Sequence, residues 1–164
     1  MTRIAIIGPE SVGKTTLACQ LGQRLGMTVV EEYARKYVEQ LDHRYTYQDV
    51  ENIAQQQVNE YKLNPHAVFD TEMIITKVWF DVVFGKHPDW LDPWINSHKM
   101  DFYVLLKPTI PWVYDPVREN PEKREQLYQE YLDEVLSLKV PYMECDPLNP
   151  QLTDIIVDAL HRDW

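Results

Sequence analysis

The sequence predicts an α/β fold with three layers, in which a five-stranded parallel sheet is flanked by helices on both faces. Short apolar runs alternate with longer segments of helical periodicity along the 164 residues, as in doubly wound sheets. The first run, RIAII at 3–7, is continuously apolar, which is typical of a strand covered on both faces. The length fits a single domain, 1–164.

Each expected element follows from a local pattern. Leu17, Ala18, Leu21 and Leu25 give the first helix a buried stripe. Pro141 suits only a sheet edge or a strand start, which makes the last strand the weakest. The expected strands are 3–7, 27–30, 67–70, 102–106 and 140–144, and the expected helices are 13–25, 33–41, one from 46, one after 70, 124–138 and one from 150.

Composition excludes several classes of function. Acidic side chains outnumber basic ones by 26 to 16, and the net charge of −10 disfavours general nucleic-acid binding. No apolar run is long enough to predict membrane insertion, and no signal peptide is recognisable. Cys19 and Cys145 match no metal or redox spacing. We therefore expect a cytoplasmic protein with a small-molecule substrate, and the sequence leaves its oligomeric state open.

The strongest motif is GPESVGKT at 8–15, which matches G-x-x-x-x-G-K-[ST] in full and stands between a strand and a helix. Such a loop turns its backbone N–H groups toward phosphate oxygens, while its lysine reaches the β- and γ-phosphates and its last hydroxyl ligates Mg²⁺. The motif predicts a P-loop NTPase fold that binds a nucleotide and Mg²⁺. We expect the nucleotide to be ATP, and the sequence leaves the choice between ATP and GTP open. The expected nucleotide-binding residues are Gly8, Glu10, Ser11, Val12, Gly13, Lys14, Thr15 and Thr16.

Carboxylates end two of the expected strands at the ligand-binding edge of the sheet. Asp70 ends the third strand and is expected to hold Mg²⁺ together with Thr15. Glu31 and Glu32 end the second strand, where a carboxylate could accept the proton of an attacking hydroxyl. We expect Glu32 to be this general base, and Asp70 stays open as the alternative.

A polar segment broken by prolines, about 114–125, predicts a lid between the fourth strand and a helix. Small-molecule kinases close such segments over the phosphates, and arginines in them stabilise the transferring phosphoryl group. Arg118 and Arg124 are the expected catalytic arginines, with Lys14 completing the cationic set. No N-K-x-D motif occurs, which disfavours a switch GTPase.

Several further motifs stand in the same order as in a known family. They are E-Y-A-R at 32–35, Y-V at 37–38, D-T-E at 70–72 with Thr76, and P-W-V at 111–113 followed by Asp115, Arg118 and Arg124. Together with the phosphate loop, this combination resembles the ribosylnicotinamide kinase domain of NadR-type proteins over nearly the whole chain. The resemblance implies a nucleoside-kinase-like fold and phosphorylation of the 5′-hydroxyl of nicotinamide riboside (NR) to nicotinamide mononucleotide, at the expense of ATP.

The resemblance also implies a riboside site formed by Glu32, Tyr33 and Arg35. Thr71, beside Asp70, is a further candidate for a riboside contact, as is Trp79, whose aromatic face would attract the positive pyridinium. Two alternatives stay open: a kinase of another nucleoside or small alcohol with the same machinery, and a regulatory P-loop ATPase module that hydrolyses ATP slowly.

Overall fold

The computed structural model describes residues 1–10, 12–110 and 123–163. Within these ranges, five strands form one sheet in the order β2-β3-β1-β4-β5, and every neighbouring pair is parallel. This confirms the predicted sheet. The strands are β1 (Arg3–Ile7), β2 (Thr28–Val30), β3 (Ala67–Asp70), β4 (Phe102–Leu106) and β5 (Tyr142–Cys145).

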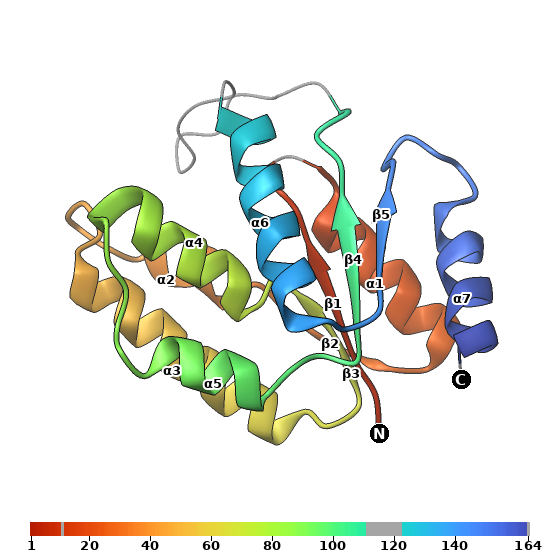
Figure 1. Cartoon of the computed structure of the whole chain (residues 1–164), viewed down its shortest axis with the longest axis horizontal. Helices are drawn as coiled ribbons and strands as arrows, with labels where there is room; N and C mark the ends of the chain where they lie inside the picture. Colours follow the sequence, from red (N-terminus) through yellow and green to blue (C-terminus); the bar gives the residue numbers. More distant parts are fainter. Residues whose placement is uncertain (11, 111–122, 164) are drawn as a thin grey trace.

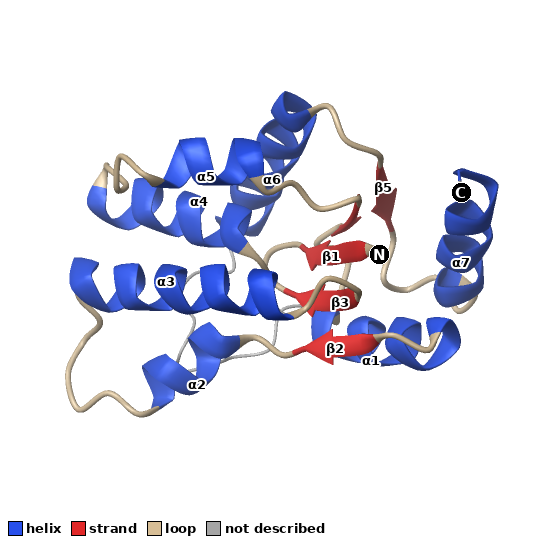
Figure 2. Ribbon diagram, turned by 90° about the horizontal axis from the view of Figure 1, so that it is seen from below, coloured by secondary structure: helices blue, strands red, loops and turns tan. Residues whose placement is uncertain are grey.

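Helices cover both faces of the sheet, which gives the predicted three layers (Figures 1 and 2). Ile4 and Ile6 of β1 face α1 (Lys14–Leu25) and α7 (Leu152–Asp163), whereas Ala5 of the same strand faces the opposite core. That second core includes side chains of α3 (Tyr47–Leu63), α4 (Met73–Phe84), α5 (Leu91–Ser97) and α6 (Arg124–Leu138). The side-chain period of two in a strand separates the two cores.

Most elements lie where the sequence predicts them, and the differences fall at polar or proline-containing ends. β5 begins after Pro141, which has no N–H to contribute to the sheet but whose carbonyl accepts from Tyr103 N. The short α5 has no counterpart among the expected elements, because its seven residues are too few to show a clear period. The predicted second helix is shorter than expected, α2 (Tyr33–Glu39).

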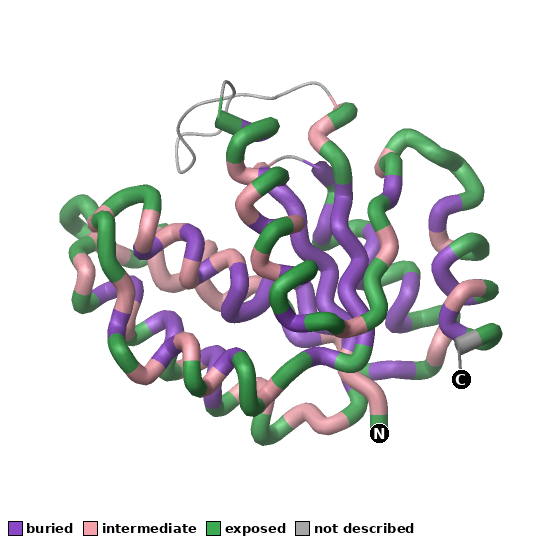
Figure 3. The backbone as a smooth tube through the Cα atoms, in the orientation of Figure 1, coloured by how far each residue is buried: buried purple, intermediate pink, exposed green. Residues whose placement is uncertain are grey.

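The central strands of the sheet are the most buried part of the fold (Figure 3). β3 and β4 are buried along their full length, whereas β5 at the edge of the sheet has only Cys145 buried. Among the described helices, none is both long and apolar enough to cross a membrane. The phosphate loop follows the carboxyl end of β1, and Asp70 ends the neighbouring strand β3. These predicted site residues therefore lie at the same edge of the sheet.

Candidate active site

The phosphate loop joins β1 to α1, and two of its positions require glycine. Gly13 adopts φ 83°, in the left-handed region, at the N-cap of α1. A Cβ on Gly8 would lie 2.7 Å from the carbonyl oxygen of Leu106, because the loop passes directly over the end of β4. These two glycines let the chain turn sharply from the strand into the helix N-terminus, as an anion-binding loop requires.

Lys14 is the first residue of α1 and is buried, with 8% of its surface exposed. Its Nζ donates hydrogen bonds to the carbonyl oxygens of Gly8, at 2.8 Å, and Pro9, at 3.1 Å. The ammonium group is therefore held over the loop, where it can exchange these carbonyl contacts for phosphate oxygens.

Thr15 and Asp70 meet across the ends of β1 and β3. The Thr15 hydroxyl donates to Asp70 Oδ2 over 2.6 Å, and Asp70 is buried. Parallel pairing places Asp70 opposite Ile6 of β1, so the carboxylate emerges beside the phosphate loop. A hydroxyl and a carboxylate are the hard oxygen ligands that Mg²⁺ prefers, and this pair therefore fits the predicted metal site.

Glu32, the N-cap residue of α2, and Arg35 of α2 line one part of a cavity of about 130 Å³. Phosphate-loop residues line its other side, namely Val12, Gly13, Lys14, Thr15 and Thr16. Glu31, by contrast, forms an exposed ion pair with Lys36, and the hydrogen bond from that lysine lowers the pKa of Glu31. Of the two neighbouring glutamates, Glu32 is the one that lines this cavity.

Arg124 lies close to the phosphate loop although it is distant in sequence. Its Nη2 donates to the carbonyl oxygen of Ile110 over 2.7 Å, and the side chain of Ile110 reaches within 3.8 Å of the point where a Cβ on Gly13 would lie. Arg124 is 7% exposed, and its Nε is buried with no hydrogen-bond partner in the described ranges. Arg118 and most of the predicted lid lie outside the described residues, as does Ser11.

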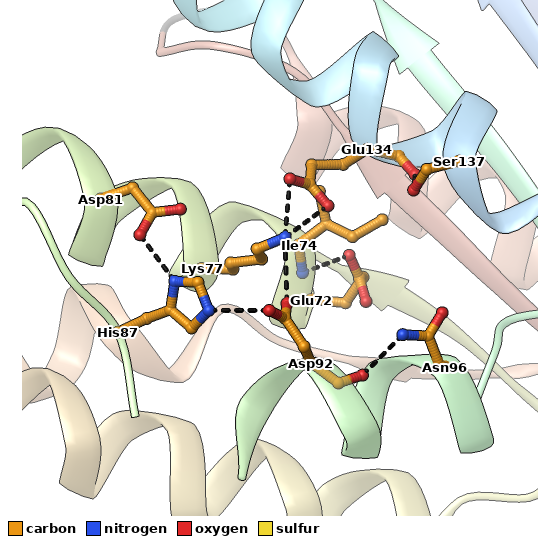
Figure 4. A network of polar contacts seen from close by, with 9 residues as sticks. All are labelled: Glu72, Ile74, Lys77, Asp81, His87, Asp92, Asn96, Glu134 and Ser137. Carbon is orange, nitrogen blue, oxygen red and sulfur yellow. Dashed lines mark hydrogen bonds and ion pairs between the residues drawn. The ribbon is translucent and has the colours of Figure 1, made fainter. Parts of the chain in front are cut away.

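An ion-pair network fixes α6, which begins at Arg124, to the rest of the fold (Figure 4). Lys77 of α4 donates to both carboxylate oxygens of Glu134 on α6, at 2.8 and 2.9 Å, and pairs with Asp92 of α5 at 3.0 Å. His87 bridges Asp92 and Asp81. Burial lowers the pKa of His87, but the hydrogen bonds to Asp81 and Asp92 outweigh it, and the net shift is upward.

The remaining predicted substrate contacts, Tyr33, Thr71 and Trp79, are not among the described residues that line this cavity. Tyr33 begins α2, with its ring 6.0 Å from that of Tyr37. Thr71 has φ 73°, in the left-handed region, and its buried hydroxyl has no partner among the described residues. Trp79 packs edge-on against Tyr45 at 4.9 Å on the outer part of α4. Their roles stay predictions.

Sequence reasoning named Glu72 only within the D-T-E motif and gave it no role, whereas the structure buries its side chain two residues from Asp70. Its carboxylate caps α4 by accepting from Ile74 N over 2.7 Å, and it borders a cavity of about 10 Å³, the size of one water molecule. Burial raises the pKa of Glu72 to about 8. A carboxyl two residues after a strand-ending Asp is the signal that was available in the sequence.

A parallel sheet whose first strand runs through this loop into a helix, with a lysine and a hydroxyl at the turn, defines a P-loop nucleotide-binding protein. A family model of an AAA domain matches residues 3–149, and the chain belongs to this family.

Two bacterial proteins are similar to this chain in sequence. The trifunctional NAD biosynthesis/regulator protein NadR of Salmonella typhimurium is 27% identical over 124 residues, as is that of Escherichia coli. Each match covers 70% of this chain and 30% of the relative, so the chain corresponds to less than a third of these proteins.

Solved structures share the fold over 98% or more of the chain. A NadR protein in complex with NAD and AMP-PNP aligns with a TM-score of 0.75 and 22% identity, over 49% of its own length. A NadR protein in complex with NR gives 0.74 and 22%, over 51%. Deoxyadenosine kinase from M. mycoides gives 0.70 and 15% over its full length. The architecture is therefore that of NadR and of nucleoside kinases.

Proposed function

We propose that this chain is an ATP- and Mg²⁺-dependent kinase that phosphorylates the 5′-hydroxyl of nicotinamide riboside to give nicotinamide mononucleotide. The observation that carries the proposal is the shared cavity, in which a carboxylate and a guanidinium on α2 face the lysine and hydroxyl of the phosphate loop. The names of the relatives support the choice of substrate, since they include NAD biosynthesis and a complex with NR.

The proposed reaction transfers one phosphoryl group. The 5′-oxygen of the riboside forms a bond to the γ-phosphorus, the bond from that phosphorus to the β,γ-bridging oxygen breaks, and ADP leaves. Glu32 accepts the hydroxyl proton, because a primary alcohol is far too weak an acid to lose it unaided at neutral pH. Asp70 is the alternative acceptor for that proton.

The phosphate side stabilises the charge that moves during transfer. Lys14 lies at the N-terminus of α1, where its ammonium group can donate to the γ-phosphate oxygens as their negative charge changes in the transition state. Thr15 and Asp70 would hold Mg²⁺, which when bound neutralises phosphate charge. Arg124 brings a buried N–H to the same neighbourhood, and a phosphate oxygen is a suitable acceptor for it.

A kinase of another nucleoside is the second candidate. The full-length match to deoxyadenosine kinase favours it, and nothing in the phosphate loop distinguishes the two acceptors. A regulatory module that hydrolyses ATP slowly would need no acceptor at all.

A riboside screen, read by coupled ADP release and by mass spectrometry of the product, tests the proposal. We expect ATP turnover to rise steeply with nicotinamide riboside and to stay at the background level with its 5′-deoxy analogue, which lacks the attacking oxygen. If another nucleoside stimulated turnover and nicotinamide riboside did not, that nucleoside would be the substrate. Turnover that no hydroxyl compound stimulates would indicate the ATPase module.

A further inference from the structure

The helix that carries Glu32 and Arg35 has almost no apolar anchor. None of the residues 33–39 of α2 is buried, and none belongs to either hydrophobic core (Figure 3). Core packing normally fixes a helix of a globular protein, because a short helix is marginal by itself. Polar contacts must therefore set the position of α2 opposite the phosphate loop.

Those contacts converge on Asp49, in the first turn of α3. Its Oδ1 accepts from the Tyr37 hydroxyl of α2 over 2.9 Å. Its Oδ2 accepts from the backbone N–H of Thr46 at 2.7 Å and from the Thr46 hydroxyl at 2.9 Å, and lies 3.1 Å from His43 Nε2. Asn52 Nδ2 in turn donates to the Tyr37 hydroxyl over 3.0 Å. One carboxylate thus joins α2, the connecting loop and the start of α3.

The Asp49 carboxylate is well suited to this task. It is 8% exposed, and the Thr46 N–H, with the Thr46, Tyr37 and His43 side chains, lowers the pKa of Asp49 to about 2. It remains ionised at neutral pH, and hydrogen bonds to a charged acceptor are roughly twice as strong as neutral ones. Asp49 also completes the capping box of α3 with Thr46, which fixes its own position.

We propose that Tyr37 and Asp49 are positioning residues, which hold the rotation of α2 and thereby aim Glu32 and Arg35 at the phosphate loop. Successive residues of an α-helix point about 100° apart, so Arg35 and Tyr37 lie on nearly opposite sides of α2. When Tyr37 is hydrogen-bonded to α3, Arg35 therefore lies on the side of α2 that faces away from α3, where it lines the cavity.

Small rotations matter at this distance from the helix axis. With a helix radius of about 5–6 Å including side chains, a turn of about 10° moves a side chain by roughly 1 Å. Misplacement by that amount can lower a transfer rate by as much as about 10²-fold. This consequence for catalysis rests on the proposed function, whereas the tether itself does not.

The experiment compares Tyr37→Phe, Asp49→Asn and the double variant. Tyr37→Phe keeps the ring and removes only the hydroxyl. The matched control is Tyr61→Phe. Tyr61 lies at the other end of α3, and its hydroxyl donates to the carbonyl oxygen of Lys99. We expect kcat/KM for nicotinamide riboside to fall about tenfold in each single variant and the two losses to be non-additive in the double. Binding of AMP-PNP, measured by calorimetry, should change less than twofold.

Amide hydrogen exchange gives a readout that does not depend on activity. Amides of α2 should exchange faster in both single variants, while those of α1 should not, and the control should match the wild type. Unchanged exchange in α2 would overturn the tether, and riboside kinetics within twofold of wild type in an active enzyme would overturn its role in positioning Glu32 and Arg35. An equal loss of AMP-PNP binding would reduce the role to general stability. If the wild-type protein phosphorylates no riboside, the proposed function fails, and hydrogen exchange alone decides the tether.

Discussion

The phosphate side of the cavity and its α2 side are held in place by different interactions. On the phosphate side, β1 is buried from Ile4 to Ile7 and α1 buries one face against the sheet, and the loop between them follows from two glycines and the N-terminus of a helix. On the other side, α2 has no buried residue and depends on hydrogen bonds to α3. Tight packing leaves one position for the phosphate loop, whereas polar tethers allow the opposite wall to differ between related proteins. Substrate choice can then change without loss of nucleotide binding.

The largest effect should come from the packed side. Lys14→Ala should lower turnover by about 10³-fold, as expected for the loss of one charged donor to the transferring group. The fold should survive, although the contacts to the Gly8 and Pro9 carbonyls are lost. Coupled ADP release with circular dichroism measures both. Lys62→Ala, at an exposed lysine of α3, is the control, and undiminished turnover in Lys14→Ala would remove the phosphate-loop assignment.

The second prediction distinguishes the two candidate bases, Glu32 and Asp70. Glu32→Gln should lower riboside phosphorylation by about 10²-fold, because general-base assistance is lost, and should leave nucleotide affinity nearly unchanged. Glu31→Gln is the matched control, since that neighbouring carboxylate pairs with Lys36 at the surface. Asp70→Asn should instead weaken Mg²⁺-dependent activity, with partial rescue at high metal concentration.

The opposite pattern would reverse these roles. Near-normal kcat in Glu32→Gln, together with an Asp70→Asn variant that is inactive at every Mg²⁺ concentration, would make Asp70 the base. Steady-state kinetics at several Mg²⁺ concentrations distinguishes the two cases.

The same contrast explains what the sequence could predict. The phosphate loop, the parallel sheet and the Thr15–Asp70 pair follow from the succession of strands and helices along the chain and from a motif of eight contiguous residues, and both are visible in one sequence. The order of the strands within the sheet was not predicted. The tether from Tyr37 to Asp49 depends on how two helices pack, and no local pattern encodes that. The burial of Glu72 could not be predicted for a similar reason, because it results from the packing of α3, α5 and β3 around its side chain.

Glu72 provides the third prediction, which concerns stability. Burial raises the pKa of its carboxyl in the folded state to about 8, from an ordinary value of 4.5. Between these values the folded protein binds a proton that the unfolded chain does not, so stability is greatest at the acidic end and falls as pH rises. From pH 5.5 to 7.5 we expect a loss of about 2 kcal/mol in the wild type.

Glu72→Gln should remove the part of that loss that Glu72 causes, because an amide can still accept from Ile74 N and does not titrate. His87, whose raised pKa acts in the same direction, should contribute equally to both proteins. Urea unfolding at the two pH values measures the free energy of unfolding of each protein. Glu125→Gln, at an exposed position of α6, should retain the wild-type slope. Parallel pH profiles for wild type and Glu72→Gln would show that Glu72 is already ionised in the folded protein.

The smallest effect is expected at Arg124. Its Nη2 donates to the carbonyl oxygen of Ile110. Its buried Nε has no hydrogen-bond partner among the described residues and could donate to a phosphate oxygen. A hydrogen bond to a charged group contributes about 1.5–3 kcal/mol, and we expect the lower end of this range, so that Arg124→Ala lowers kcat by about tenfold. Binding of AMP-PNP should weaken much less, because a contact made mainly in the transition state raises kcat selectively.

Two further variants sharpen the result for Arg124. Arg124→Lys keeps the charge but not the planar fork of donors, and should fall between alanine and wild type. Arg24→Ala, which breaks an exposed ion pair with Asp154, should leave all kinetic constants unchanged. If Arg124→Ala altered only KM for ATP, its guanidinium would contribute to ground-state binding alone. The start of α6 would then be part of the nucleotide-binding wall, and transition-state stabilisation would rest on Lys14 and the metal site.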